Sequence, residues 1–239
     1  MRSETTSESS AKLSPIIGRQ LAALVEQQEE LRAQMALRDC LYWLTECTRT
    51  RDEQEMAGDP LKPFPLWPYF KPALQYLENE PVAPVKKSRT LMMSWVVSGW
   101  AAHKAFNRPA TKVVFQSQDE KRACHDVDYA KILWQNSIEP LRRRWKLAKP
   151  LDQQPYNRFL LANGSELVGI PGKPDQIRSE HPTIYVMEEA NIIEQAEASY
   201  NTAVATQAPH IVLIGTAGAG WFAEFISAAR WLDWPDYPG

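Results

Sequence analysis

Two adjacent carboxylates, Glu188 and Glu189, directly follow the apolar run 184–187. A short run of this kind is typical of a buried parallel strand, and open α/β folds bind ligands at the carboxyl edge of such strands. Two acids placed there could divide two tasks, one holding a hydrated Mg²⁺ and the other orienting and deprotonating an attacking water. An ordinary helix N-terminus also favours acids, so the pair alone leaves both interpretations open.

A cationic turn lies about a hundred residues upstream, in the segment 85–95 with sequence VKKSRTLMMSW. A phosphate loop needs backbone N–H groups at a helix N-terminus, a lysine for the β/γ-phosphates and a Ser or Thr for the metal. The turn supplies all of these, but Met92 and Met93 stand where the pattern G-x-x-x-x-G-K-[ST] has Gly and Lys before Ser94. An exposed basic turn is the alternative interpretation.

A third segment with chemical potential is IVLIGTAGAGW, residues 211–221. A buried strand here leads into Thr216 and three glycines, and such a loop can approach a ligand closely and change conformation. A glycine-rich connector would have the same composition.

The elements that position these segments alternate along the chain. VAPV is followed by an expected helix over 93–106, and KVVFQS by one over 119–134, which favours an α/β fold with a mostly parallel sheet flanked by helices. TIYVM and HIVLIG are further expected strands. Asn163-Gly164-Ser165, between 158–161 and 166–170, predicts a hairpin with a type I′ turn.

The chain divides into three expected regions: 1–12, polar and disordered; 13–58, a helical extension; and 59–239, the α/β domain. Apolar and glutamine residues recur in the extension at alternating spacings of four and three, at Ile17, Leu21, Leu24, Gln28, Leu31 and Met35. We expect this helix to pack on its own domain, with a subunit contact as the alternative. Five prolines and four aromatics within 59–72 predict an extended segment that lies on the surface or frames a pocket.

Composition bounds the function classes. The 239 residues include 27 Lys and Arg against 29 Asp and Glu, so nucleic-acid contact would need a local basic patch. Hydrophobic residues at 44% exclude a disordered tail. Three irregularly spaced cysteines form neither a disulfide framework nor a C-x-x-C metal site, and no 18-residue apolar run or signal-like start is present. We expect a soluble protein of a reducing cytoplasm.

Four segments in order, KKSRTLMMSW, VVFQSQDEKRA, IRSEHPTIYVMEEA and LIGTAGAGWFAEF, resemble the N-terminal ATPase half of tailed-phage terminase large subunits, the motors that drive viral DNA into the prohead. The resemblance covers about residues 60–225, and its specificity lies in the order and spacing of the four motifs. It implies a P-loop NTPase fold of the ASCE/RecA-like kind. It also implies ATP and Mg²⁺ as ligands, double-stranded viral DNA, a portal protein and a terminase small subunit as partners, and the cytoplasm of an infected bacterial host as location.

The resemblance further implies roles for single residues, because family members often carry a loop of the form K-S-x-x-x-x-x-S/T. It implies phosphate binding by Lys87, Ser88, Arg89 and Thr90, and Mg²⁺ binding by Ser94 and Glu188. Glu189 would be the catalytic residue, and Thr216 with Ala217 would couple hydrolysis to movement. Tyr69 or Phe70, with Gln75, would pack on adenine, and Arg178 would be an arginine finger that reaches the neighbouring subunit's nucleotide in a ring. Three positions depart from the family pattern: Thr90 replaces the usual Gln, Met92 the usual Gly and Glu188 the usual Asp.

Other charged residues have competing interpretations. Arg178 could form an ion pair with Glu180 or Glu188 instead. A basic cluster could contact DNA phosphates or be a solvated helix face; it comprises Arg142, Arg143, Arg144 and Lys146. The run His125 to Asp128 lacks further metal ligands, and we expect it to lie at the surface.

Only 23 residues follow Thr216 (239 minus 216), so we expect no C-terminal nuclease domain and no DNA cutting by this chain, which would be either a fragment or a motor whose nuclease is elsewhere. Two other functions stay open: a helicase-like DNA-dependent ATPase, and a weakly or non-hydrolysing nucleotide-binding scaffold module. The domain by itself could be monomeric and nearly inactive if a neighbouring subunit must complete its site.

Overall fold

The structure, a computed structural model, describes residues 15–52, 58–88, 90–216 and 218–228. The helices are α1 (Pro15–Arg38), α2 (Cys40–Glu46), α3 (Phe70–Asn79), α4 (Met93–Asn107), α5 (Glu120–Gln135), α6 (Glu139–Arg144), the 3-10 helix η1 (Leu151–Gln153), α7 (Pro174–Glu180), α8 (Ala196–Ala205) and α9 (Trp221–Ala228). The strands are β1 (Arg49–Arg51), β2 (Leu61–Pro63), β3 (Val82–Lys86), β4 (Lys112–Ser117), β5 (Arg158–Leu160), β6 (Glu166–Pro171), β7 (Ile184–Met187) and β8 (His210–Gly215). The segment 1–12, Arg89 and Ala217 lie outside the described residues, so the predictions made for them are not addressed further.

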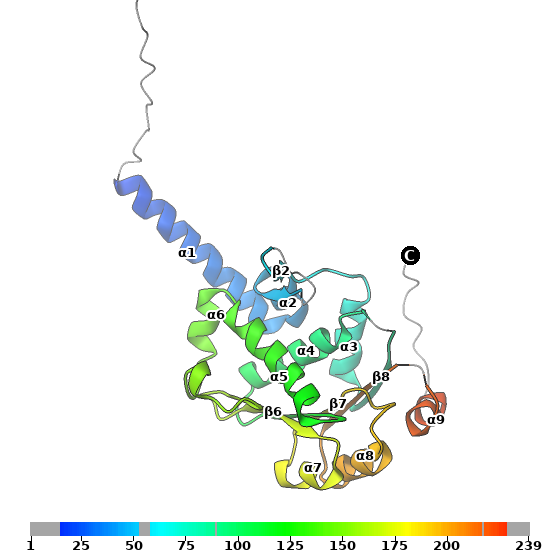
Figure 1. The fold of residues 1–239 in the computed structure, drawn as a ribbon. Helices are drawn as coiled ribbons and strands as arrows, with labels where there is room; N and C mark the ends of the chain where they lie inside the picture. The colour runs from blue at the N-terminus through cyan, green and yellow to red at the C-terminus, as the bar shows by residue number, and fades with distance from the viewer. Residues whose placement is uncertain (1–14, 53–57, 89, 217, 229–239) are drawn as a thin grey trace, which may run out of the picture.

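Six strands form one twisted sheet in the order β3-β8-β7-β4-β6-β5 (Figure 1). Five of them are parallel, and β5 pairs antiparallel with β6 at one edge. All four residues of β7 are buried, as expected for a central parallel strand covered on both faces by helices. The predicted α/β class with a mostly parallel sheet is confirmed.

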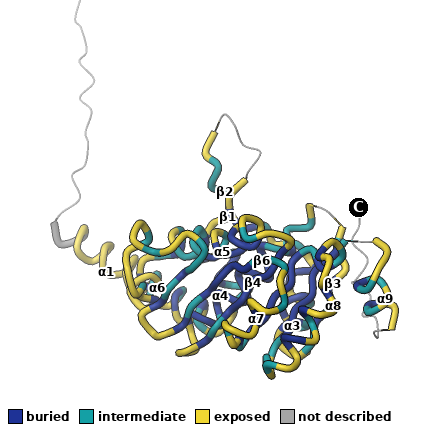
Figure 2. The backbone as a smooth tube through the Cα atoms, turned by 60° about the horizontal axis from the view of Figure 1, so that its bottom comes forward, coloured by how far each residue is buried: buried dark blue, intermediate teal, exposed yellow. Residues whose placement is uncertain are grey.

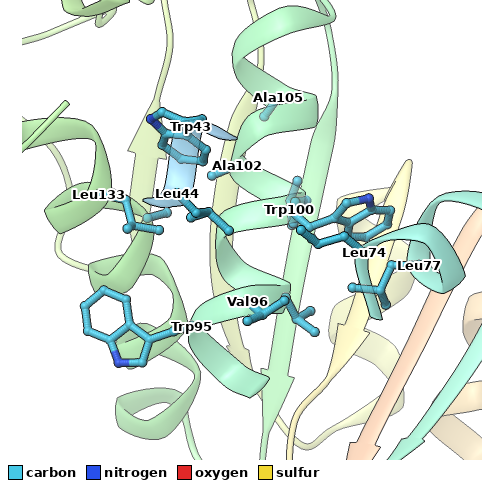
Figure 3. Packing of buried hydrophobic residues seen from close by; sticks show 14 of the residues in the cluster. Trp43, Leu44, Leu74, Leu77, Trp95, Val96, Trp100, Ala102, Ala105 and Leu133 are labelled. Atoms are coloured by element: carbon cyan, nitrogen blue, oxygen red, sulfur yellow. The ribbon is translucent and has the colours of Figure 1, made fainter. Parts of the chain in front are cut away.

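Alternate strand residues face two apolar cores, one on each side of the sheet. Val113 and Phe115 of β4 pack in the larger core with α2 to α5, whereas Val114 packs in the smaller core with α7 to α9. Figure 3 shows part of the larger core, in which Trp43 from α2 and Trp100 from α4 are fully buried. The buried backbone accordingly runs through the sheet and the helices against it, while the loops stay exposed (Figure 2).

The helices α4 and α5 begin and end within one residue of the ranges predicted from the sequence. Twelve of the fifteen residues of α4 are buried because the helix lies between the sheet, α3 and α5. Despite this apolar character, none of the described helices has both the length and the hydropathy required to cross a bilayer.

The hairpin turn between β5 and β6 differs from the predicted type I′ turn. Such a turn needs positive φ at both central residues, but Gly164 has a φ of 81° whereas Asn163 does not have a positive φ. The Gly164 N–H donates to Leu161 O at 3.2 Å, so Ala162 and Asn163 are central and the glycine follows them. Asn163 is held in place by its own contacts, since its Nδ2 donates to Ala105 O at 2.9 Å and its Oδ1 accepts from the Ser165 N–H at 3.0 Å.

The packing expected for the N-terminal helix is wrong for its apolar residues. The helix α1 projects from the body and contacts it through α2 and α6 near its C-terminal end (Figure 1). Its buried residues there are the small Ala33 and Ala36, whereas Leu24 and Leu31 are exposed. The periodic apolar positions therefore face away from the domain on which they were expected to pack.

Gly169 in β6 allows α5 to lie close to the sheet. A Cβ at this position would come within 2.9 Å of the Ala123 carbonyl carbon and 3.0 Å of the Cys124 nitrogen. These are backbone atoms of a packed helix, which cannot yield as a flexible side chain would. The glycine therefore fixes the depth of α5, the helix that carries two charged side chains to the candidate site.

We expect Gly169→Ala to lower the free energy of unfolding by about 1–3 kcal/mol, because the added methyl overpacks the contact between α5 and β6. Urea denaturation followed by circular dichroism measures this change. Gly18→Ala is the control, since no atom lies within 4 Å of a Cβ there and alanine favours an exposed helix. Equal stability of the two variants would contradict the packing argument.

Candidate functional site

Lys87, Ser94 and Glu188 meet at one point although they are far apart in the sequence. The Lys87 Nζ lies 2.7 Å from Glu188 Oε1 and donates to Ser94 Oγ at 2.8 Å. The Ser94 hydroxyl in turn donates to the same carboxylate oxygen at 2.8 Å. The cationic turn and the acid-tipped strand therefore lie together at one edge of the sheet.

The sheet order explains this meeting. β3 and β7 run parallel to β8, one on each side of it, so their carboxyl ends reach the same edge. Backbone bonds continue the pairing beyond the strand ends: the Lys87 N–H donates to Gly215 O at 2.9 Å, and the Glu188 N–H donates to Gln116 O at 2.8 Å. The backbone of both charged residues, Lys87 and Glu188, is therefore held in place by the sheet.

The N-terminus of α4 supplies the third side of the site. Ser94 lies in the first turn of α4, and Met92, the residue just before the helix, makes no side-chain cap. An uncapped helix N-terminus presents N–H groups and the positive end of the helix dipole, an arrangement that suits a phosphate.

The loop between Lys87 and α4 takes the backbone conformation of a glycine loop without containing glycine. Thr90 has a φ of 67° and Met92 a φ of 50°, both in the left-handed region. Non-glycine residues there cost roughly 1–3 kcal/mol each and cluster at ligand-binding loops. Met92 thus adopts, as methionine, a conformation that glycine would adopt without strain.

A pocket of about 640 Å³ opens beside this loop. Lys87, Ser88, Thr90 and Ser94 line one side of it, and the β1–β2 ribbon and Trp67 line the other. The proline- and aromatic-rich segment therefore frames a pocket, one of the two placements expected for it. The volume is within the range of small-molecule sites.

Glu189 directly follows Glu188 of the Lys87–Ser94–Glu188 triad, and its side chain is exposed to solvent. It has a φ of 56°, which directs the chain away from β7, and its Oε2 accepts a 2.8 Å hydrogen bond from Arg122 on α5. Both side chains are exposed, so this ion pair contributes at most about 1 kcal/mol and can be exchanged readily. The sequence singled out Glu189 but gave no role to Arg122.

Thr216 is held close to the triad by Asn191, a residue that the sequence analysis missed. The Thr216 N–H donates to Asn191 Oδ1 at 3.0 Å, and the Ala190 N–H donates to Ile214 O at 2.7 Å. Gly215 leaves room for this arrangement, because a Cβ there would lie 2.4 Å from the Phe222 ring. Asn191 thus links the segment after Glu189 to the loop after β8.

No family model matches the chain, and no curated protein matches it in sequence. Among solved structures, the HK97 bacteriophage large terminase is similar at 11% identity and a TM-score of 0.55, over 75% of this chain and 37% of that one. This chain shares its fold with part of a phage large terminase, of which it spans little more than a third. The Thermus phage P74-26 large terminase ATPase domain also matches, at 18% identity and a TM-score of 0.45, over 64% of this chain and 67% of that one.

Three residues predicted to pack on adenine do not line the pocket of this terminase fold. Tyr69 and Phe70 are 8% and 0% exposed, and the Tyr69 hydroxyl donates to Leu91 O at 2.9 Å, so neither ring has a face open to a base. Gln75 lies on α3 in a separate pocket with Arg38 and Glu78. Trp67 is the aromatic residue of the segment that lines the pocket beside Lys87.

Arg178 lies on α7 and pairs within that helix rather than with the Lys87 site. The last residue of α7, Glu180, is bonded to Lys112 at 2.6 Å, and Lys112 opens β4 at the edge opposite Glu188. Arg178 is 71% exposed in its side chain and forms a 3.6 Å ion pair with Asp175, rather than with either of the two glutamates expected as alternatives. The position leaves it available to another molecule.

The basic cluster at the end of α6 is exposed but partly neutralised. Arg143 pairs with Glu139 at 2.8 Å, and Arg144 forms a close ion pair with Glu30 of α1. Arg142 and Lys146 are exposed as well. The cluster therefore offers less net positive charge to a DNA backbone than its sequence indicates.

Asp126 is not at the surface, contrary to the sequence expectation for the run 125–128. It is 3% exposed, with Oδ1 accepting from Ser98 Oγ at 3.3 Å. Burial raises the pKa of the Asp126 carboxyl well above its usual range, and the nearby Glu188 raises that pKa further, against Lys87 and Ser98, which lower it. The expectation was wrong because α5 turns Asp126 toward α4 while His125 and Asp128 face solvent.

The donor set fits a magnesium ion. Glu188 and Ser94 offer hard oxygen ligands, and Glu188 Oε2 is buried without a hydrogen-bond partner among the described residues. Ser117 Oγ and Asp126 Oδ2 are likewise buried and unpartnered there. This excess of buried acceptor oxygens over donors is what a divalent cation would balance.

We expect Asp126→Asn to be more stable than the parent at neutral pH by about 1–3 kcal/mol, because it removes a buried carboxyl that is poorly compensated. A carboxyl whose pKa is raised on folding costs the fold nothing below the pKa of the unfolded chain, where it is protonated in both states. As pH rises above that pKa, the same carboxyl lowers the free energy of unfolding. The gain should therefore vanish near pH 4 and grow toward pH 7, as measured by urea denaturation across pH. Asp128→Asn, exposed on the same helix, should change little. A parent more stable than Asp126→Asn at pH 7 would refute the interpretation.

Proposed function

We propose that this chain is the ATPase motor domain of a viral terminase large subunit, hydrolysing Mg-ATP to move double-stranded DNA into a prohead. The observation that carries the proposal is the convergence of Lys87, Ser94 and Glu188 at an uncapped helix N-terminus. Lysine, hydroxyl and carboxylate at one such point are the groups that a phosphoryl-transfer site needs. The terminase fold supports the same conclusion.

Lys87 has two alternative anionic partners in this mechanism. In the structure it neutralises Glu188, a 2.7 Å pair with side chains only 16% and 10% exposed. When triphosphate enters, the Lys87 side chain would move so that its ammonium group contacts the β/γ-phosphates. Glu188 and Ser94 would then hold the metal. Bound Mg²⁺ supplies charge neutralisation at the phosphate oxygens. The exchange keeps every buried charge compensated throughout.

Glu189 would act as the base that orients and deprotonates the attacking water. Its carboxylate lies at the mouth of the site and is held by Arg122 at 2.8 Å. This pair occupies Oε2, so Glu189 must turn from Arg122 to reach a water. Thr216, tied to Asn191, would sense the γ-phosphate and pass the change to the loop after β8.

Arg178 would complete the site of a neighbouring subunit. It is exposed and pairs with Asp175 of its own helix, so it is available to serve as a finger in trans. A ring of subunits around double-stranded DNA, docked on a portal protein and supplied with DNA through a small subunit, provides that neighbour. The exposed Arg142 and Lys146 are candidate contacts to DNA phosphates.

We expect Glu189→Gln to retain ATP binding and to lower DNA-stimulated phosphate release by about 10²–10⁴-fold, because the base is lost while the Lys87 triad remains. Fluorescent ATP-analogue binding and phosphate release, measured with DNA and portal present, test this. Glu194→Gln is the control, an exposed acid outside the triad. Phosphate release by the parent no higher than that of Glu189→Gln would favour a non-hydrolysing scaffold, and strand separation without a portal would favour a helicase-like ATPase.

Arg178→Ala should lower DNA-stimulated turnover by about 10³–10⁵-fold and leave ATP binding unchanged. Mixing Arg178→Ala with Glu189→Gln should restore part of the turnover, because some interfaces then combine an intact Glu189 with an intact Arg178. Asp175→Ala, which removes only the 3.6 Å partner of Arg178, is the control and should retain turnover. No recovery in the mixture would contradict a role in trans.

A further inference from the structure

The helix α1 exposes a stripe of large apolar side chains along its free side. Its members are each between 49% and 61% exposed: Leu21, Leu24, Val25, Leu31 and Met35. The N-terminal half of α1 projects beyond the body, so nothing within the described part of the chain covers it (Figure 1). Contiguous exposed apolar surface of this kind marks an interaction site.

The spacing of the apolar residues in this stripe indicates that the partner covering it is a second helix. Leu21, Leu24, Gln28, Leu31 and Met35 follow one another at intervals of three, four, three and four, a period of 3.5 residues. That period keeps a seam facing a second helix in a left-handed coiled coil, whereas a helix packed on a globular surface favours 3.6.

We propose that α1 pairs in parallel with α1 of a second copy of this chain. The flanking positions that would meet across such a seam are Gln20, Gln27 and Gln34 on one side and Val25 and Arg32 on the other. No acid and only one cation stand there, so a second copy brings no like-charge clash. A different helical partner would ordinarily be selected by several charges at these positions, and Arg32 is the single charge there.

Gln28 sets the direction of the pair. It is the one polar residue within the seam, and it is exposed on the side of α1 away from the body. In a parallel pair Gln28 faces Gln28 of the second copy, where two amides can hydrogen-bond each other; in an antiparallel pair it would face an apolar residue. A single polar seam residue fixes register in this way.

The body of the protein leaves room for this pairing. Ala33 and Ala36, the buried residues of α1, face the body, and the stripe lies on the other side of the helix. Glu30 is directed toward the body as well, through its ion pair with Arg144. The inference stands apart from the proposed ATPase activity, because it concerns a surface distant from Lys87.

Light scattering of the full chain without nucleotide tests the pairing. We expect a mass twice the 27.2 kDa of one chain at high concentration, and a return to 27.2 kDa for the variant Leu24→Glu with Leu31→Glu. Both leucines are exposed, so circular dichroism should be unchanged. Leu66→Glu is the control, a leucine 67% exposed outside α1, and should stay dimeric. A monomeric parent, or a double variant that remains associated, would overturn the proposal.

Disulfide trapping tests the direction. Under oxidation Gln28→Cys should give a covalent dimer on a non-reducing gel, because the two sulfurs face each other in a parallel seam. Glu26→Cys, two residues away on the far side of the helix, should stay monomeric on the same gel. A dimeric mass for Gln28→Cys without the covalent dimer would overturn the parallel arrangement.

Discussion

The candidate site depends on one constraint, the compensation of the Glu188 charge. Its side chain is only 10% exposed, and transferring a carboxylate out of water costs several kcal/mol unless partners replace the water. Lys87 and Ser94 replace it through bonds of 2.7 and 2.8 Å. These partners are available only because β3, β8 and β7 are adjacent and parallel. The strand order of the sheet therefore determines the site.

The helix α4 also provides a hydrogen-bond donor to a second buried carboxyl, one turn after Ser94. Ser94 and Ser98 are four residues apart on α4 and therefore face the same way, one bonding Glu188 and the other Asp126. Two carboxyls thus lie along one helix face against a single lysine, with burial and the Glu188 charge both raising the pKa of Asp126. This crowding leaves Glu188 Oε2 and Asp126 Oδ2 buried without a hydrogen-bond partner among the described residues.

The sequence predicted the parts of this arrangement that depend on local pattern. The strand ends, α4, α5 and the edge position of Glu188 follow from periodicity and from the rule that parallel strands end together. The burial of Asp126 was missed because His125 and Asp128 beside it are polar and exposed, whereas the orientation of α5 in the fold turns Asp126 inward. The exposure of Leu24 was missed for a similar reason: an apolar stripe has the same spacing whether its partner is in the same chain or another.

Tyr69, predicted to pack on adenine, contacts the loop between Lys87 and α4 in the structure. A loop with left-handed Thr90 and Met92 stores strain that glycine would avoid, so its shape must be imposed from outside. The buried Tyr69 bonds Leu91 O at 2.9 Å, between the two strained residues, and Met93 immediately after them is 3% exposed in the core. The aromatic segment therefore packs against the loop between Lys87 and α4, where a buried contact holds a backbone shape that glycine could adopt without strain.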